Sequence, residues 1–106
     1  LDYDVTSIFQ NGLARIYEDG LYGYINTNGE RVIDCIYEDA NTFSEDGLAV
    51  VGDGELWGYI DESGNTVTDC IYSEADDFYN GSAEVVTEGG DTLEISVTGE
   101  TIGFVE

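Results

Sequence analysis

The feature that most constrains the fold is a pattern that recurs every 35 residues along the chain. Residues 22–25 read YGYI and residues 57–60 read WGYI, and Gly29, Gly64 and Gly99 keep the same spacing. Matches at a fixed period are the sequence signature of repeat proteins, in which each unit is one supersecondary element. Such a unit cannot bury its apolar side chains alone, so neighbouring units must pack on one another.

The period divides the chain into units of nearly equal length. We expect one repeat domain over residues 1–106, with units at residues 3–36, 37–71 and 72–106. A length of 106 residues suits a single compact domain, and a hydrophobic content of 42% is close to that of ordinary globular proteins.

Each unit contains a segment in which apolar residues alternate with residues that change from unit to unit. Alternation with a period of two is typical of a β-strand with one packed face and one wet face. The constant positions are therefore predicted core residues, and the changing positions are candidate contacts for a partner. The constant positions are Ala14, Ile16, Ala49, Val51, Ala83 and Val85, and the changing positions are Arg15, Val50 and Glu84.

A turn follows this strand and leads to an aromatic-Gly pair in a second strand. Asp-Gly between alternating segments is a strong signal for a β-hairpin, and Asp53 in this turn is a further candidate contact for a partner. The pairs Tyr22-Gly23 and Trp57-Gly58 are predicted core positions, since burial of a large ring outweighs the roughly 0.5–1 kcal/mol cost of a strand glycine. We expect a ring or the backbone of a neighbouring element to cover both glycines.

A second turn, which ends in glycine, precedes a third strand, so each unit is predicted to be a three-stranded meander. The segment that opens each unit has apolar and aromatic residues three positions apart, as in Tyr37, Ala40 and Phe43. This spacing predicts a single helical or 3₁₀ turn with its rings packed inward.

The combined pattern resembles the WG-repeat family of bacterial proteins. The residues that carry the resemblance are Phe followed shortly by Gly-Leu-Ala, the string WGYID at residues 57–61, a glycine turn, and Val-x-Asp-Cys-Ile-Tyr. The first unit has Tyr22 in place of the tryptophan, and the third unit has LEIS at residues 93–96 where the motif should stand. The resemblance implies a β-rich repeat module used for interaction, and it implies no catalytic residues.

We therefore predict an all-β fold of three ~35-residue β-meander repeats, stacked in a solenoid-like array. Three units of this size are also compatible with a closed pseudo-threefold body, such as a prism or a trefoil-like fold. Termini that lie close together would favour the closed alternative.

The charge of the chain is strongly one-sided. It has 24 acidic residues against 2 basic ones, Arg15 and Arg31, and a formal net charge of −22. This excludes nucleic-acid binding through phosphate neutralisation and disfavours anionic lipid surfaces, and no apolar run reaches the ~18 residues of a membrane span. The acidic surface has three interpretations: solubilisation of a secreted or salt-adapted protein, a surface loaded with cations, or imitation of a nucleic-acid backbone.

The residue types needed for most catalytic sites are missing. The chain has no histidine, so a Ser-His-Asp triad cannot form and a zinc site is not expected. Acidic pairs are too abundant to indicate hydrolysis, and no string matches a calcium-binding loop, so only weak surface calcium is expected. Cys35 and Cys70 share one repeat position and are interpreted as small buried residues, with a disulfide as the alternative. We thus expect no catalytic residues, no metal site and no cofactor.

These observations favour a non-enzymatic repeat module that binds a protein or ligand, at a bacterial cell surface or in secreted form. One alternative is a structural subunit that assembles end to end through its terminal strands, with help from divalent cations. Another is an acidic inhibitor that occupies a nucleic-acid channel. The expected partner is a protein or a second copy of the chain, without direct nucleic-acid binding or membrane insertion.

Overall fold

The computed structural model describes residues 3–105, and these residues form eleven β-strands and no helix. The strands make two antiparallel sheets, one of four strands and one of seven, so the predicted all-β class is confirmed. The strands are β1 (Asp4–Val5), β2 (Leu13–Glu18), β3 (Leu21–Asn26), β4 (Arg31–Tyr37), β5 (Asp39–Ala40), β6 (Leu48–Gly52), β7 (Trp57–Asp61), β8 (Thr66–Ala75), β9 (Ser82–Thr87), β10 (Thr92–Ser96) and β11 (Thr101–Val105).

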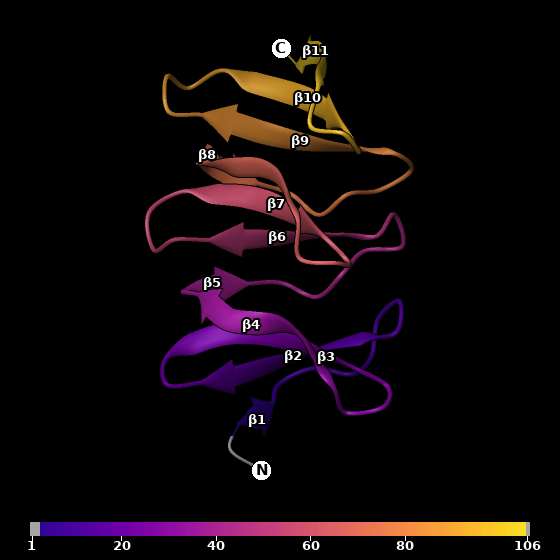
Figure 1. Ribbon diagram of the computed structural model, residues 1–106. Coiled ribbons are helices and arrows are strands. Elements are labelled where there is room, and N and C mark those ends of the chain that lie inside the picture. Colours follow the sequence, from indigo (N-terminus) through magenta and orange to yellow (C-terminus); the bar gives the residue numbers. More distant parts are fainter. Residues whose placement is uncertain (1–2, 106) are drawn as a thin grey trace.

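Strands that follow one another in the chain are also neighbours in space. The order is β1-β2-β3-β4 in the first sheet, and β5 to β11 follow in sequence order in the second. The body is elongated, with extents of 46 × 26 × 19 Å, and β1 and β11 lie at its opposite ends (Figure 1). Neither sheet of the described residues closes into a barrel, so the closed pseudo-threefold alternative is wrong.

The strand pairing repeats with the period of the sequence. Tyr22 lies opposite Tyr37 in the pair β3–β4, and Trp57 lies opposite Tyr72 in the pair β7–β8. Both pairs have register shifts at the same two places. The first part of β8 pairs with β7 and its last part with β9, so this strand links the second unit to the third. β4 and β5 together link the first two units in the same way, with a bend at Glu38 between them.

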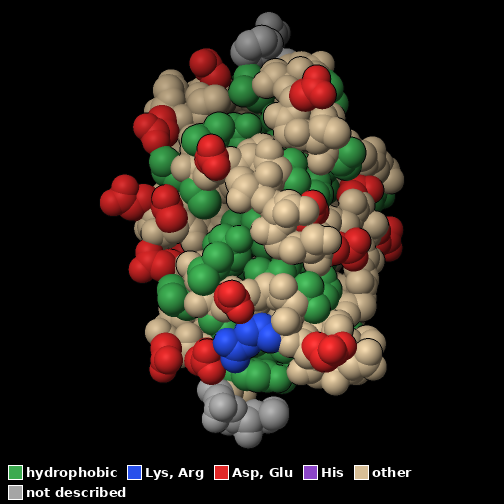
Figure 2. All heavy atoms as spheres, viewed as in Figure 1, with side chains coloured by type: hydrophobic (Ala, Val, Ile, Leu, Met, Phe, Trp, Pro, Cys, Tyr) green, Lys and Arg blue, Asp and Glu red, His purple; other side chains and the backbone are tan. Residues whose placement is uncertain are grey.

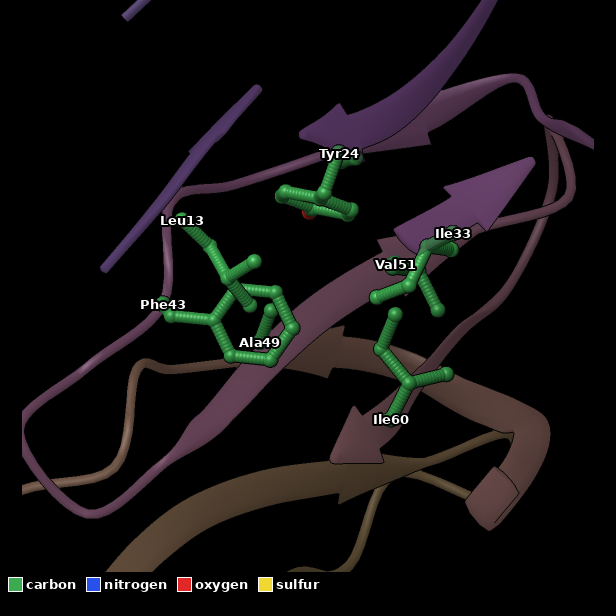
Figure 3. Packing of buried hydrophobic residues seen from close by; sticks show 8 residues of the cluster. Leu13, Tyr24, Ile33, Phe43, Ala49, Val51 and Ile60 are labelled. Atoms are coloured by element: carbon green, nitrogen blue, oxygen red, sulfur yellow. The ribbon is translucent and has the colours of Figure 1, made fainter. Parts of the chain in front are cut away.

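The buried side chains form clusters that are shared between units. Figure 3 shows residues of β2, β3 and β4 pointing toward residues of β6, β7 and the segment that follows β5. A second cluster joins the second unit to the third. The first shared cluster contains Leu13, Tyr24, Ile33, Ala40, Phe43, Ala49, Val51 and Ile60, and the second contains Leu48, Val50, Tyr59, Tyr72, Phe78, Ala83, Val85 and Ile95.

The predicted core positions lie in or against buried clusters. The rings of Tyr22 and Trp57 are half-buried, each packed against one of the two shared clusters. The remaining predicted core positions are buried. They are Ala14, Ile16, Gly23, Ala49, Val51, Gly58, Ala83 and Val85.

The changing positions of the first strand do not share one wet face. Glu84 is exposed and Arg15 is half-buried, but Val50 is only 1% exposed, so the expectation of a wet, partner-facing residue is wrong there. Val50 belongs to β6, whose alternate residues enter the two different shared clusters. Both faces of β6 are covered because this strand lies in the middle of the body, between the first unit and the third (Figure 1).

The segment that opens each unit is extended, so the prediction of a helical or 3₁₀ turn is wrong. Tyr37 ends β4, Ala40 lies in β5, and Phe43 follows in an irregular segment. The bend at Glu38 interrupts the two-residue alternation of the strand, and this interruption produces the three-residue spacing. The predicted inward packing holds for Ala40 and Phe43, which are buried in the first shared cluster.

Gly23 and Gly58 are covered by the backbone of the neighbouring strand, as predicted. An ideal Cβ at Gly58 would lie 2.6 Å from the carbonyl oxygens of both Thr68 and Asp69, where β8 bulges over the glycine. No side chain fits in that space, which explains glycine in a strand interior despite its cost. In the third unit Leu93 takes this place, and β10 pairs with β11 without a register shift at that residue. The glycine and the bulge thus occur together.

Candidate functional site

A row of exposed aliphatic side chains follows the third strands of the units, β4, β8 and β11. Ile36 and Ile71 are equivalent residues, one period apart, and they are 61% and 51% exposed. Val32 and Ile102 are a second equivalent pair, two periods apart, and both are exposed, whereas Val67 at the same place in the second unit is half-buried. We call the four exposed residues the third-strand row. Single exposed aliphatic residues are ordinary, but their recurrence at equivalent positions offers a partner a periodic apolar surface.

Carboxylates flank the third-strand row. Asp34 lies between Val32 and Ile36 in β4, Asp69 precedes Ile71 in β8, and both aspartates are exposed. Figure 2 shows this mixture on a larger scale, with hydrophobic side chains visible along the middle of the face and acidic ones along both margins. Such a surface suits a partner that combines apolar and basic groups.

Arg31 is engaged by an acidic neighbour in its own unit. Its Nη1 and Nη2 donate to the two carboxylate oxygens of Glu18 at 3.0 and 3.2 Å, and its Cζ lies 5.3 Å from the centre of the Tyr3 ring. The hydrogen bonds that Arg31 donates to Glu18 raise the pKa of Arg31 above its ordinary value. This positive charge is therefore compensated within the first unit.

Arg15, a predicted partner contact, is directed into the protein. Its Nη1 donates to the carbonyl oxygen of Ala40 at 2.7 Å, and its Nε donates to the hydroxyl of Thr6 at 2.9 Å. Its Cζ lies 5.0 Å from the centre of the Tyr22 ring, within the range of a cation–π contact. The guanidinium thus ties the first unit to the start of the second.

Asp53, another predicted partner contact, is exposed but is used by its own turn. Its Oδ1 accepts hydrogen bonds from the backbone N–H groups of Leu56 and Glu55 at 2.9 and 3.0 Å. These bonds hold the pKa of Asp53 below its usual value. Asp61 accepts two backbone N–H groups in the next turn in the same manner.

The structure does not bring the four predicted partner contacts together. Arg15 lies in β2, Val50 in β6, Glu84 in β9, and Asp53 in the turn after β6. Glu84 lies opposite Glu94 of β10. Arg15, Val50 and Glu84 were grouped only because they have equivalent positions in the three units, and equivalent positions in different units are not neighbours in space.

The joints between units depend on two tyrosines that sequence reasoning did not single out. The hydroxyl of Tyr24 donates to the carbonyl oxygen of Asn41 at 2.5 Å, and its ring meets the ring of Phe43 edge-on at 4.8 Å. Tyr59 makes the corresponding two contacts in the next joint at the same distances. The sequence did contain a signal for these residues, because YGYI and WGYI both have tyrosine in the third place.

These two tyrosines predict a sensitivity to alkaline pH. Burial raises the pKa of both Tyr24 and Tyr59 above the ordinary value of 10.0. Their contribution to stability is therefore fully present below pH 10.0 and is lost as the pH rises beyond it, because the unfolded chain releases these protons first. We expect circular dichroism to show unfolding together with the appearance of tyrosinate absorbance. The Y24F/Y59F variant should lose less stability between neutral and alkaline pH, and tyrosinate formation by both residues in a folded protein would contradict the prediction.

Cys35 and Cys70 are free, half-buried thiols, and no disulfide joins them. The Sγ of Cys70 lies 3.8 Å from the carbonyl oxygen of Val51, as a weak donor. Burial raises the pKa of both thiols, so little reactive thiolate is present at neutral pH.

Within residues 3–105, no three histidine, cysteine or acidic side chains are grouped so that they could hold a metal ion. The described part of the chain also contains no helix with the length and apolar character needed to cross a membrane.

Comparison with protein families matches the repeated part of the chain. A family model described as "WG containing repeat" matches residues 22–56 and 57–90, so the matches adjoin and cover more than half of the chain. No curated protein matches the chain. The two family matches begin at Tyr22 and Trp57, each of which directly precedes a glycine covered by a backbone bulge.

Proposed function

Since the chain belongs to the WG containing repeat family, we propose that it is a non-enzymatic repeat module that binds a basic protein partner. Its three units form a solenoid-like stack, and the protein acts at a bacterial cell surface or after secretion. Two observations support the stack: side-chain clusters are shared between successive units, and the strand registers recur after one period.

The observation that carries the binding proposal is the third-strand row. Its two isoleucines, Ile36 and Ile71, are more than half exposed at equivalent positions of successive units. Large apolar side chains at the centre of an interface supply most of its binding energy, whereas the polar rim adds specificity. A partner with apolar groups at a matching period would cover both residues at once.

The charge of the chain supports a basic partner. The chain has a net charge of −22, and its two arginines are both held by groups of the first unit or the start of the second. Aspartates beside the third-strand row add negative charge at the contact itself. A basic partner is therefore attracted at long range and paired at short range, and its association should slow as salt is added.

A synthetic peptide of alternating valine and lysine tests this proposal, with an alternating valine and glutamate peptide as the control ligand. We expect calorimetry to detect binding of the lysine peptide only, and we expect added salt to weaken it. The I36S/I71S variant should bind it about tenfold more weakly, since two exposed apolar contacts are removed. The V97S variant is the matched control, because Val97 is also exposed but lies outside the row. Equal losses in both variants, or no loss in either, would refute the assignment of the row.

The β1 end of the body favours a second candidate function, a structural subunit that assembles end to end. Val5, Ile8 and Phe9 are all exposed there. The equivalents of Phe9 in the other units, Phe43 and Phe78, are buried under a tyrosine of the preceding unit. Light scattering with and without calcium tests assembly, since calcium would reduce the repulsion between acidic chains. A monomer at high protein and calcium concentrations would rule it out.

A further inference from the structure

The first unit has an arginine at a position where the second unit has a valine. The arginine is Arg15, which lies opposite Tyr24 in the strand pairing. Val50 has the equivalent position in the second unit, opposite Tyr59. The backbone contacts agree, because the carbonyl oxygen of each residue accepts a backbone N–H from the segment that follows β1 or β5.

The surroundings of the Arg15 guanidinium have counterparts in the second unit. One period beyond Tyr22, whose ring lies under the guanidinium, is Trp57. One period beyond Ala40, whose carbonyl oxygen accepts from Nη1, is Ala75. The valine that replaces the arginine has no positive charge and no hydrogen-bond donor, so it offers the ring of Trp57 and the carbonyl group of Ala75 nothing equivalent to the guanidinium that their counterparts contact in the first unit.

A pocket of about 270 Å³ lies at this place in the second unit. It is smaller than the roughly 300–1,000 Å³ of sites for drug-sized ligands, and it suits the end of a single side chain. The lining residues have more negative charge than their counterparts, since Asp76 stands one period beyond Asn41. The pocket is lined by Asn41, Val50, Trp57, Glu74, Ala75 and Asp76.

We infer that this pocket binds the guanidinium group of an arginine side chain, presented by the basic partner of the proposed function on which this inference rests. The indole ring is the best aromatic platform for a cation–π contact. The carboxylates of Glu74 and Asp76 are acceptors for charge-assisted hydrogen bonds to the guanidinium N–H groups. Arginine is preferred to lysine because its planar group stacks on a ring and donates several hydrogen bonds at once.

The third unit does not repeat this arrangement. Glu84 is the counterpart of Val50 there, and Thr92 is the counterpart of Trp57. No aromatic platform is therefore present at that position, and the inference concerns the second unit alone.

The chain contains a single tryptophan, so its fluorescence reports directly on Trp57 and the pocket. The experiment titrates the intact protein with N-acetyl-arginine methylamide and, at equal ionic strength, with N-acetyl-lysine methylamide. We expect a saturable change in emission with the arginine compound and at least several-fold weaker binding of the lysine compound. Equal effects of the two compounds would overturn the inference, because they would indicate only general attraction of cations to an acidic protein.

Two variants test the position of the bound group. E74Q/D76N should weaken arginine binding by about tenfold, whereas D19N/E62Q, which removes the same charge from exposed residues outside the pocket, should leave it nearly unchanged. V50R should place a guanidinium over Trp57 from within, alter the emission without ligand, and abolish binding of the arginine compound. Because Val50 is buried, V50R is first compared with the parent protein by circular dichroism, and E74Q/D76N is decisive if V50R does not fold. Identical binding by the two acid-to-amide variants would overturn the inference.

Failure of this inference can be told apart from failure of the proposed function. The peptide of alternating valine and lysine contains no arginine, so most of its binding comes from the third-strand row, whose contribution the I36S/I71S variant measures, and little comes from the pocket. If that peptide binds while the arginine compound does not, the proposed function stands and the arginine pocket is refuted.

Discussion

The G58A variant is expected to unfold at a temperature on the order of 10–20 °C lower than the parent protein. The new Cβ would lie 2.6 Å from the carbonyl oxygens of Thr68 and Asp69, which belong to backbone and cannot move aside as a flexible side chain could. The bulge of β8 must shift or the pairing with β7 must break. We expect a loss of about 3 kcal/mol in the free energy of unfolding, at the upper end of the costs of overpacking. Thermal and urea unfolding, followed by circular dichroism, measure it.

G103A is the matched control for this prediction. Gly103 is also a strand glycine, but the nearest heavy atom to its ideal Cβ is a flexible Glu94 side-chain oxygen at 3.9 Å. Alanine there should be neutral or should stabilise the protein by up to about 1 kcal/mol, because glycine is the costlier strand residue. G23A should behave like G58A, since its Cβ would meet the backbone of β4. If G58A and G103A have the same stability, the bulge is not the reason for the glycine.

The Y59A variant is expected to lose about 4 kcal/mol of the free energy of unfolding, or to remain unfolded at ambient temperature. Tyr59 is fully buried, its ring packs edge-on against Phe78, and its hydroxyl donates to the carbonyl oxygen of Asp76. Removal of the ring leaves a cavity between the second and third units. Denaturant unfolding measures the loss in the free energy of unfolding. Two transitions instead of one would show that the third unit unfolds before the rest of the protein.

Two further variants separate the ring from the hydroxyl and from tyrosine content in general. Y59F keeps the ring and should cost about 1–2 kcal/mol, because the carbonyl oxygen of Asp76 loses its donor. Y79A removes a tyrosine that is 77% exposed and should change stability by less than about 0.5 kcal/mol. A loss in Y59A no larger than that in Y79A would show that this joint does not hold the units together.

The all-β class and the hidden glycines could be predicted because both follow from local rules. Alternation identifies a strand, and a glycine repeated in a strand interior requires a close neighbour, which the backbone of β4 and β8 supplies. The extended segment after Tyr37 could not be predicted in the same way. A spacing of three residues is produced either by a helical turn or by a bend between two strands, and only the pairing of Ala40 with Val51 decides between them.

The candidate site was harder to predict, because it depends on which units lie on either side of a residue. Arg15 and Val50 are equivalent in sequence, but the short Val50 is buried in the second shared cluster whereas the longer Arg15 is half-buried, so comparison of units could not reveal that Val50 is buried. The third-strand row consists of ordinary strand residues such as Ile36, whose exposure follows from the packing of complete units. The pocket beside Trp57 becomes visible only when two units are compared in space.

The positions of Arg15 and Arg31 affect how a cationic ligand approaches the protein before it binds. Both lie in the first unit, and no basic residue follows Arg31 in the chain, so the electrostatic potential is more negative over the second and third units than over the first. A cationic molecule that comes within about one Debye length, roughly 8 Å in physiological salt, is pulled along this gradient before it docks. The charge of the protein is therefore distributed unevenly along its long axis. This asymmetry would favour one orientation of an elongated cationic ligand over the opposite one.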